Sequence, residues 1–159
     1  MLAMAACVAT AAAAQAPTFT IRLLTPEAAL KAAQAALAKC RAQGYQVAVA
    51  VVDRGGITQV MLRDRLAGPH TVDLATNKAW TAVSFRTPTR DLERLTRPGE
   101  SMSGLRNVPR FTAIGGGVTI EAGGSLFGGI GVSGAPGGDA DHVCATAGIQ
   151  AISEELELQ

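Results

Sequence analysis

The stretch GGSLFGGIGVSGAPGGDADHVCATAGIQAI, residues 123–152, contains a strand, a glycine-rich loop and the start of a helix in direct succession. Residues 118–133 have the apolar composition of a β-hairpin that turns at Gly123–Gly124. Residues 134–138 are predicted to form a loop, and Asp139 begins the last helix. The second half of the chain therefore predicts a hairpin followed by a helix.

The first half of the chain predicts a helix, a hairpin and a second helix. Thr25-Pro26-Glu27 has the composition of a helix start, and Gly44 suits the end of that helix. The further predicted elements are a strand buried on both faces (45–53), its hairpin partner (57–64), a helix (70–85) and a short polar helix from 87–88 onward. Hairpin-linked strands give a mainly antiparallel sheet, so we expect an α+β fold with helices packed against it.

The composition excludes several classes of protein. Of the 159 residues, 48% are hydrophobic and 17% are charged, which is typical of one packed globular domain. The net charge of +1 argues against a nucleic-acid partner, because phosphate binding needs a strong basic excess. Aromatic residues make up 4% of the chain, which argues against a platform for stacking bases.

The N-terminal residues have the pattern of an export signal. The apolar run that ends in Ala12-Ala13-Ala14 is too short to span a bilayer and fits a cleaved secretory signal peptide over 1–14. We then expect an extended segment over 15–24, a single domain over 25–159, and a periplasmic or secreted protein. A lipoprotein acylated at Cys7 and a disordered alanine-rich tail are the alternatives.

Two cysteines, Cys40 and Cys144, remain after removal of the signal peptide. Each lies on the apolar side of a predicted helix, where cysteine commonly packs as a small hydrophobic residue, and this is the interpretation we favour. An oxidising compartment also permits a disulfide, provided that the two Cα atoms lie within about 7 Å of each other.

The glycine-rich loop is a candidate anion-binding site. A loop that leads into a helix exposes backbone N–H groups at the positive end of the helix dipole, which suits a carboxylate. The candidate residues of this site are Gly134, Gly137, Gly138, Asp141 and His142. Alternatively, Asp139 caps the helix and already fills the position of the anion. The pattern leaves open whether Asp141 and His142 face a cleft or solvent.

Basic residues provide further candidates. Lys78 lies on an apolar helical stripe, so its ammonium group either reaches solvent, which is the commoner case, or is held by a ligand carboxylate or by Asp53. Residues 86–110 contain six arginines and three acidic residues. Such a run is usually a solvated or subunit-contact surface, although guanidinium groups also bind carboxylates in bidentate fashion.

Three short patterns suggest other chemistry. Gly129–Gly134 matches the dinucleotide-binding glycine pattern, but it lies within a predicted strand and lacks a following βαβ unit. Ser133 resembles the nucleophile of a hydrolase elbow without the required histidine order. His70, at a predicted helix start, is a possible axial ligand for haem iron, although a capping or surface histidine is the commoner case.

Four segments are similar to the GlcG/HbpS-type haem-binding family, which also supplies the C-terminal domain of PduO-type corrinoid adenosyltransferases. They are VAVVDRGG (49–56), AGPHTVDLATNKAWTAVSFRTPT (67–89), GGGVTI (115–120) and GGIGVSGAPGGDADHVCATAGIQAI (128–152). One departure is Thr119, where the family usually has proline.

The resemblance implies a profilin-like domain with about five mainly antiparallel strands, helices on both faces and frequent homo-oligomers. It also implies binding of haem or a related tetrapyrrole, with haem degradation proposed for the family. Because the iron ligand differs among members, His70, which lies inside a matching segment, is the first candidate and His142 the second.

The leading hypothesis is an exported protein that binds haem and sequesters or presents it. The glycine-rich hairpin would offer a flat surface to the porphyrin, Lys78 and arginines would bind the propionates, and His70 would bind the iron. The alternative is an enzyme or accessory protein that acts on a small hydroxy- or keto-acid such as glycolate, held by Lys78, Asp53 and Asp141 at the 134–138 loop. No nucleophile or general-base pair is identified, so a binding protein is favoured. A purely structural or signalling role of an oligomer surface is the third possibility.

Overall fold

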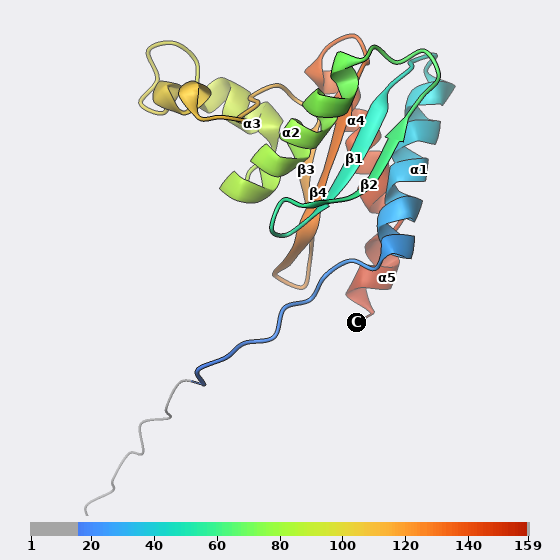
Figure 1. Ribbon diagram of the computed structural model, residues 1–159, viewed down its shortest axis with the longest axis vertical. Helices are drawn as coiled ribbons and strands as arrows, with labels where there is room; N and C mark the ends of the chain where they lie inside the picture. Colours follow the sequence, from blue (N-terminus) through green and yellow to red (C-terminus); the bar gives the residue numbers. More distant parts are fainter. Residues whose placement is uncertain (1–15, 159) are drawn as a thin grey trace, which may run out of the picture.

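The computed structural model describes residues 16–158, so the predicted signal peptide and Cys7 lie outside the described residues. Figure 1 shows a sheet with helices on either side of it. In chain order the elements are α1 (Pro26–Ala42), β1 (Ala48–Asp53), β2 (Thr58–Arg63), α2 (His70–Phe85), α3 (Thr89–Leu95), the 3-10 helix η1 (Ser103–Asn107), β3 (Gly117–Ala122), β4 (Ser125–Ser133), α4 (Gly138–Gln150) and α5 (Ser153–Glu157). None of the helices in this part of the chain has the length and apolar character needed to cross a membrane.

The sheet has the strand order β2-β1-β4-β3, and every neighbouring pair is antiparallel. Ala48 pairs with Ser133 at one end of β1, and Asp53 pairs with Gly128 at the other. The predicted antiparallel α+β fold is confirmed. The expectation of about five strands is not confirmed, since residues 16–158 form four strands. The segment 16–24 does not pair with the sheet.

The helices cover both faces of the sheet (Figure 1). α1 and α4 pack together on one face, and α2 packs on the other against β1, β3 and β4. Val49 and Val51 of β1 belong to the large core under α1 and α4, whereas Ala48 and Ala50 pack with Ala75 of α2. The prediction that this strand is buried on both faces is therefore confirmed.

Glycines in β4 allow α2 to approach the sheet closely. A Cβ atom on Gly131 would lie 2.0 Å from the carbonyl oxygen of Ala75, and one on Gly129 would lie 2.6 Å from Val83 Cγ2. These two positions of the apparent dinucleotide motif are thus needed for helix–sheet packing.

The predicted start of the first helix is confirmed, whereas the predicted C-terminal helix differs from the structure. The Thr25 hydroxyl accepts a hydrogen bond from the Ala28 N–H at 3.2 Å, and Pro26 is the first residue of α1, as predicted. The predicted single C-terminal helix is wrong, because it is divided into α4 and α5. The Ser153 hydroxyl donates to the Gln150 carbonyl at 3.0 Å, a side-chain bond to the backbone that competes with continued helix.

Candidate functional site

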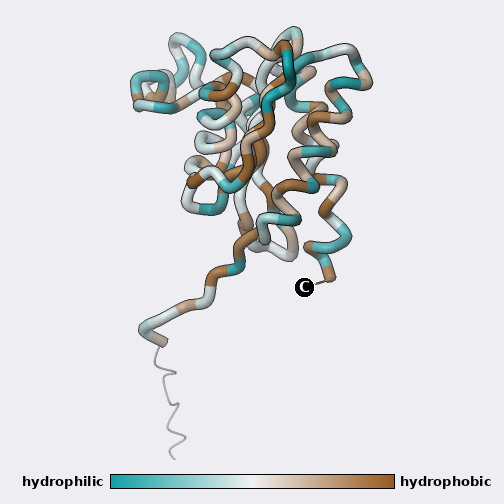
Figure 2. The backbone as a smooth tube through the Cα atoms, turned by 45° about the vertical axis from the view of Figure 1, so that its right-hand side comes forward, coloured by the Kyte–Doolittle hydropathy of each residue, from teal (hydrophilic) through white to brown (hydrophobic). Residues whose placement is uncertain are grey.

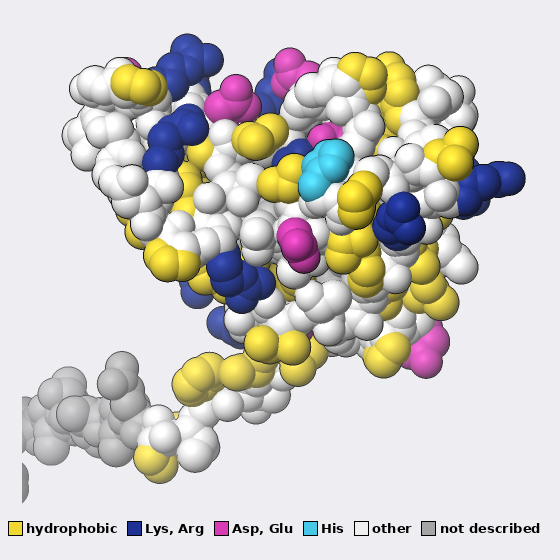
Figure 3. Space-filling model, turned by 45° about the horizontal axis from the view of Figure 1, so that its top comes forward, with side chains coloured by type: hydrophobic (Ala, Val, Ile, Leu, Met, Phe, Trp, Pro, Cys, Tyr) yellow, Lys and Arg dark blue, Asp and Glu magenta, His cyan; other side chains and the backbone are white. Residues whose placement is uncertain are grey.

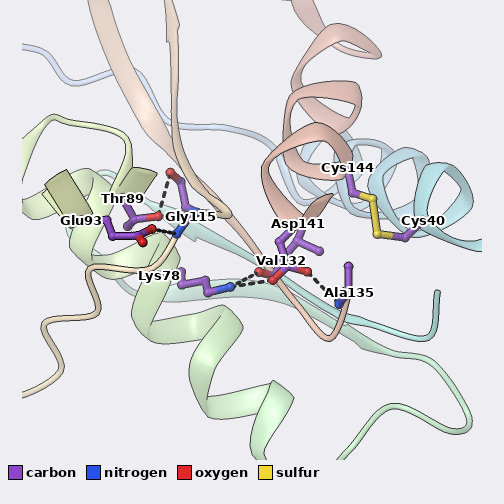
Figure 4. Close-up of polar contacts among 10 residues, drawn as sticks. Cys40, Lys78, Thr89, Glu93, Gly115, Val132, Ala135, Asp141 and Cys144 are labelled. Atoms are coloured by element: carbon purple, nitrogen blue, oxygen red, sulfur yellow. Dashed lines mark hydrogen bonds and ion pairs between the residues drawn. A yellow bond between two sulfur atoms is a disulfide. The ribbon is translucent and has the colours of Figure 1, made fainter. Parts of the chain in front are cut away.

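A buried ion pair joins the two helix layers at one end of the sheet (Figure 4). Lys78 of α2 is 2% exposed and Asp141 of α4 is 3% exposed. Lys78 Nζ lies 2.7 Å from Asp141 Oδ2 and donates to the Val132 carbonyl at 3.0 Å. The prediction that this ammonium group reaches solvent is wrong. Its partner is Asp141 and not Asp53, because the helical stripe that carries Lys78 faces the end of β4.

A run of three glycines, 115–117, makes room for this pair. A Cβ atom on Gly116 would lie 2.7 Å from Asp141 Cβ and 3.1 Å from Lys78 Nζ, and the φ angle of Gly116 is +119°. Any side chain here would therefore collide with the pair and strain the backbone. The glycine run at the start of β3 lets a lysine from one layer reach an aspartate from the other.

Asp141 also fixes the glycine-rich loop. Its Oδ1 accepts a hydrogen bond from the Ala135 N–H at 3.0 Å. Burial raises the pKa of the Asp141 carboxyl, while the Lys78 ammonium group and hydrogen bonds from the backbone of Ala135 and Gly134 oppose that rise. A carboxylate of the chain itself thus occupies the position at which an external anion was predicted.

The interpretation of Asp139 as the helix cap is wrong. The N-cap of α4 is Gly137, with no side-chain cap, and the helix begins at Gly138. The Asp139 side chain is exposed and pairs with Arg90 Nε at 3.0 Å. The carboxylate that binds the loop comes from Asp141, two residues further on.

The three residues of the hypothetical small-acid cleft do not line one cavity. Asp53 lies in the turn after β1, where its Oδ1 accepts hydrogen bonds from the Gly55 N–H at 2.8 Å and the Ile57 N–H at 3.0 Å. In the register of β1 with β4, Asp53 is five residues from the end that approaches Lys78, which is about 17 Å along a strand. Lys78 and Asp141 are paired in the interior, away from Asp53.

His70 is exposed at the first position of α2, above a loop that hydrogen bonds hold in place. The Thr71 hydroxyl donates to the Gly68 carbonyl at 2.6 Å, and the Arg63 guanidinium donates to the Ala67 carbonyl at 2.6 and 3.0 Å. The imidazole lies against Gly68, where a Cβ atom would be 2.7 Å from His70 Cε1. Leu66 in the same loop is 77% exposed. The loop and the start of α2 therefore present an apolar side chain and an imidazole to the outside.

His142 is half-buried on α4, one residue after Asp141. Its Nδ1 is buried and has no hydrogen-bond partner. Burial lowers the pKa of the imidazole, and nearby Arg90 adds to this, so the neutral form is favoured. A groove of about 590 Å³ beside it is lined by Lys39, His142, Val143, Thr146, Ala147 and Gln150.

The seven candidate residues thus fall into three groups. Lys78 and Asp141 meet in the interior, the exposed Gly134 contributes a backbone hydrogen bond to Asp141, and Gly137 and Gly138 lie at the start of α4. The two histidines lie nearer the surface on different helices. The start of α2 and the 134–138 loop lie at the same end of the sheet (Figure 1), and Figure 3, in which this end is turned toward the viewer, shows a histidine with both hydrophobic and charged side chains beside it.

α3 supports the glycine run with two residues that the sequence did not single out. The Thr89 hydroxyl accepts a hydrogen bond from the Gly117 N–H at 2.8 Å, and Glu93 Oε2 accepts one from the Gly115 N–H at 3.4 Å (Figure 4). The local signal was the threonine just after a proline at a helix start, a position from which side chains commonly bind backbone groups.

The arginines of residues 86–110 mainly make contacts within the fold. Arg106 donates to the Thr96 carbonyl at 2.6 Å, and the Arg110 guanidinium lies 4.9 Å from the centre of the Trp80 ring. Arg94 and Arg97 are exposed and line a hollow of about 260 Å³ that also contains Asp91 and Glu93. This hollow is mixed in charge, so it is not a strongly basic site.

Cys40 and Cys144 form a disulfide between α1 and α4, with the two Cα atoms 5.5 Å apart. The favoured prediction that both pack as free thiols is therefore wrong. The helices cross where each has its cysteine on the buried side, a juxtaposition of residues 104 positions apart that neither local pattern contains.

Fold and site together define a class of small domain. It has a four-stranded antiparallel sheet between two helix layers, which a buried lysine–aspartate pair joins through a glycine run. Among residues 16–158, no three or more His, Cys, Asp or Glu side chains gather as a metal site would require. The chain belongs to the HbpS-like family, described as "haem degrading protein HbpS-like", whose match covers residues 24–150. The resemblance stated from the sequence is confirmed.

Three relatives illustrate the similarity. HbpS of Streptomyces reticuli, solved as a double mutant, is 40% identical with a TM-score of 0.81, covering 92% of this chain and 99% of that chain. A PduOC–haem complex is 31% identical with a TM-score of 0.77, covering 82% and 95%. An uncharacterized 15.0 kDa protein from the dhaT-dhaS intergenic region of Citrobacter freundii is 35% identical over 136 residues, which is 84% of this chain and 95% of that protein.

Proposed function

We propose that this protein binds haem, with His70 as the axial ligand of the iron. Membership of the HbpS-like family and the similarity to a PduOC–haem complex support haem as the ligand. The observation that carries the choice of ligand is the exposed imidazole of His70 at the start of α2, beside a hydrogen-bonded loop. Iron can approach this nitrogen donor without any rearrangement of the core.

His142 fits the role of an iron ligand less well. A histidine that binds a metal through one ring nitrogen commonly donates its other N–H to a carboxylate or carbonyl group. The Nδ1 of His142 is buried without such a partner, so a proton fixed there would remain unsatisfied. His142 is therefore the second candidate, although the groove beside it has room for part of a ligand.

The surroundings of His70 suit a porphyrin. Leu66 offers an apolar contact to the macrocycle, and the neighbouring exposed guanidinium of Arg65 can pair with a propionate. Lys78 cannot serve the propionates, because it is buried and already paired with Asp141. Bound haem would supply an iron centre whose reactivity depends on the axial ligand, and His70 would set that ligand.

The physiological role that we propose is sequestration or presentation of haem outside the cytoplasm. The Cys40–Cys144 disulfide supports an oxidising compartment, in agreement with the signal-like pattern of residues 1–14. The description of the family supports a link to haem degradation, which would appear as progressive loss of the haem absorption in the presence of a reductant and oxygen.

A haemin titration followed by visible spectroscopy tests the proposal. The wild type is compared with His70→Ala, and His142→Ala is the matched control. We expect a saturable shift of the Soret band in the wild type and in His142→Ala, and at least tenfold weaker binding in His70→Ala. Loss of the shift in His142→Ala alone would move the ligand to α4, and a wild type without a saturable shift would exclude haem binding.

A further inference from the structure

A groove lies between α1 and α4, the two helices that cover one face of the sheet (Figure 1). Its volume is about 590 Å³, which is in the range of small-molecule sites. Both hydrophobic and hydrophilic positions occur along these helices (Figure 2). Lys39 of α1 contributes to the lining, and the other lining residues belong to α4: His142, Val143, Thr146, Ala147 and Gln150. The groove therefore offers polar and apolar side chains to one ligand.

The disulfide between Cys40 and Cys144 joins the two helices that form this groove. Lys39 is the residue before Cys40, and Val143 is the residue before Cys144. The covalent link therefore lies directly beside two of the residues that line the groove. A preformed site loses less free energy to ordering of the protein when a ligand binds. The disulfide thus preorganises the groove.

The charge of the groove favours an anion. Lys39 is exposed, and its ammonium group takes no part in the ion pairs of residues 16–158. The residues that line the groove include no aspartate or glutamate. A single imidazole without a carboxylate or thiol beside it does not suit a metal ion. A singly charged anion matches the single lysine of this groove.

His142 supplies a second hydrogen-bond donor. Burial lowers the pKa of its imidazole and Arg90 adds to this, against the opposing effect of Asp91 and Asp139, so the ring is neutral at neutral pH. A neutral imidazole carries one proton, on Nδ1 or on Nε2. Nδ1 is buried without a partner, and buried N–H groups without an acceptor are rare in proteins, so the proton lies on Nε2. Because the ring is half-buried with Nδ1 on its buried side, Nε2–H is the donor that a molecule in the groove can reach.

We propose that this groove binds a small monocarboxylate with an apolar body. The carboxylate accepts hydrogen bonds from the Lys39 ammonium group and from His142 Nε2–H. The apolar body packs on Val143, which is 45% exposed, and on the half-buried Ala147. The site requires neither haem nor His70, so it is separate from the haem function proposed above.

Titration of the haem-free full chain with phenylacetate, followed by nitrogen–proton NMR of the backbone amides, tests the site. We expect saturable shifts at residues 142–150 and at the end of α1, and none with phenylacetamide, the uncharged analogue, at the same concentrations. Lys39→Gln should bind phenylacetate about tenfold more weakly, the loss expected for one hydrogen bond to a charged group. Lys31→Gln, which removes the same charge from the same helix outside the groove, is the control and should bind as the wild type does. A wild type without saturable shifts, equal binding of phenylacetamide, or equal binding by Lys39→Gln would overturn the proposal.

The ring nitrogens of the two histidines provide a measurement that does not depend on a lysine variant. We expect phenylacetate to shift the Nε2 resonance of His142 and to leave that of His70 unchanged, with His70→Ala used for the assignment. His142→Phe, which retains a ring but no N–H, should bind phenylacetate more weakly than the wild type. A shift at His70 in place of His142, or unchanged binding by His142→Phe, would contradict the site. Because these titrations contain no haem, their failure is distinguishable from a failure of haem binding.

Discussion

At the scale of single residues, Lys78 and Asp141 are held in the interior by each other and by backbone groups on both sides. Lys78 donates to the Val132 carbonyl, and Asp141 accepts from the Ala135 N–H. A buried ion pair of this kind adds little to the free energy of unfolding when it is intact. Removal of one partner is costly, because it leaves the other charge buried without compensation. The pair therefore specifies how α2, β4 and α4 meet more than it adds to overall stability.

Removal of one charge should be worse than removal of both. We expect Lys78→Met to lower the free energy of unfolding by about 3–5 kcal/mol, since Asp141 is then buried without its counter-charge. Lys78→Met combined with Asp141→Asn should recover part of this loss, because asparagine still accepts from Ala135. Urea denaturation of the wild type, both single variants and the double variant gives the coupling free energy between the two side chains. Additive losses would show that the two side chains do not act as a pair.

Asp64 provides a pH-dependent contribution to stability. Its carboxylate accepts from Arg41 Nε at 2.7 Å and Nη2 at 2.9 Å, and this pairing lowers its pKa from 3.8 to about 2. Because the folded-state pKa lies below the unfolded value, the stabilisation is present above pH 3.8 and is lost as the pH falls through about 2.

The Asp64→Asn variant should therefore lose stability at neutral pH and show a smaller further loss on acidification than the wild type. Urea denaturation between neutral pH and about pH 2 measures this difference. Glu121→Gln, which removes an exposed carboxylate on β3, is the matched control and should follow the wild type. If the free energy of unfolding of Asp64→Asn fell with pH in parallel with that of the wild type, the role of the Arg41–Asp64 pair would be contradicted.

At the scale of elements, the disulfide ties α1 to α4 on one face of the sheet. Closing a loop of this length restricts the unfolded chain, and loss of a native disulfide typically costs about 2–5 kcal/mol. We expect Cys40→Ser/Cys144→Ser to be destabilised by that amount in urea denaturation. Alkylation and mass measurement before and after reduction should show two additional reactive thiols after reduction. Full alkylation without reduction would show that the cysteines are free.

Elements with local signals were predicted well from the sequence. The helix start at Thr25-Pro26 and the hairpin turn at Gly123–Gly124 depend on residues that are neighbours in the chain. The pairing of Lys78 with Asp141 and the disulfide join residues 63 and 104 positions apart, and no local pattern specifies such partners. The sequence contained a lysine on an apolar stripe, Lys78, and an acid after a glycine-rich loop, Asp141. Neither pattern indicated that the two side chains are in contact.

At the scale of the whole molecule, the two ends of the sheet carry different features. One end carries His70, the glycine-rich loop and the buried pair, and the segment before α1 leaves the domain at the other end (Figure 1). The sequence singled out candidate residues that lie at the first end, but their division into buried and exposed groups required the fold. Haem binding at His70 should therefore be insensitive to substitutions in residues 18–23.

The most direct test of the central claim is the visible spectrum of the ferric haem complex of the wild type beside that of His70→Met. If His70 binds the iron, replacing its nitrogen by a thioether sulfur changes the axial ligand and should shift the Soret and long-wavelength bands. His142→Met should leave the spectrum as in the wild type. Identical spectra for the wild type and His70→Met, at full saturation with haem, would contradict the assignment of His70 as the iron ligand.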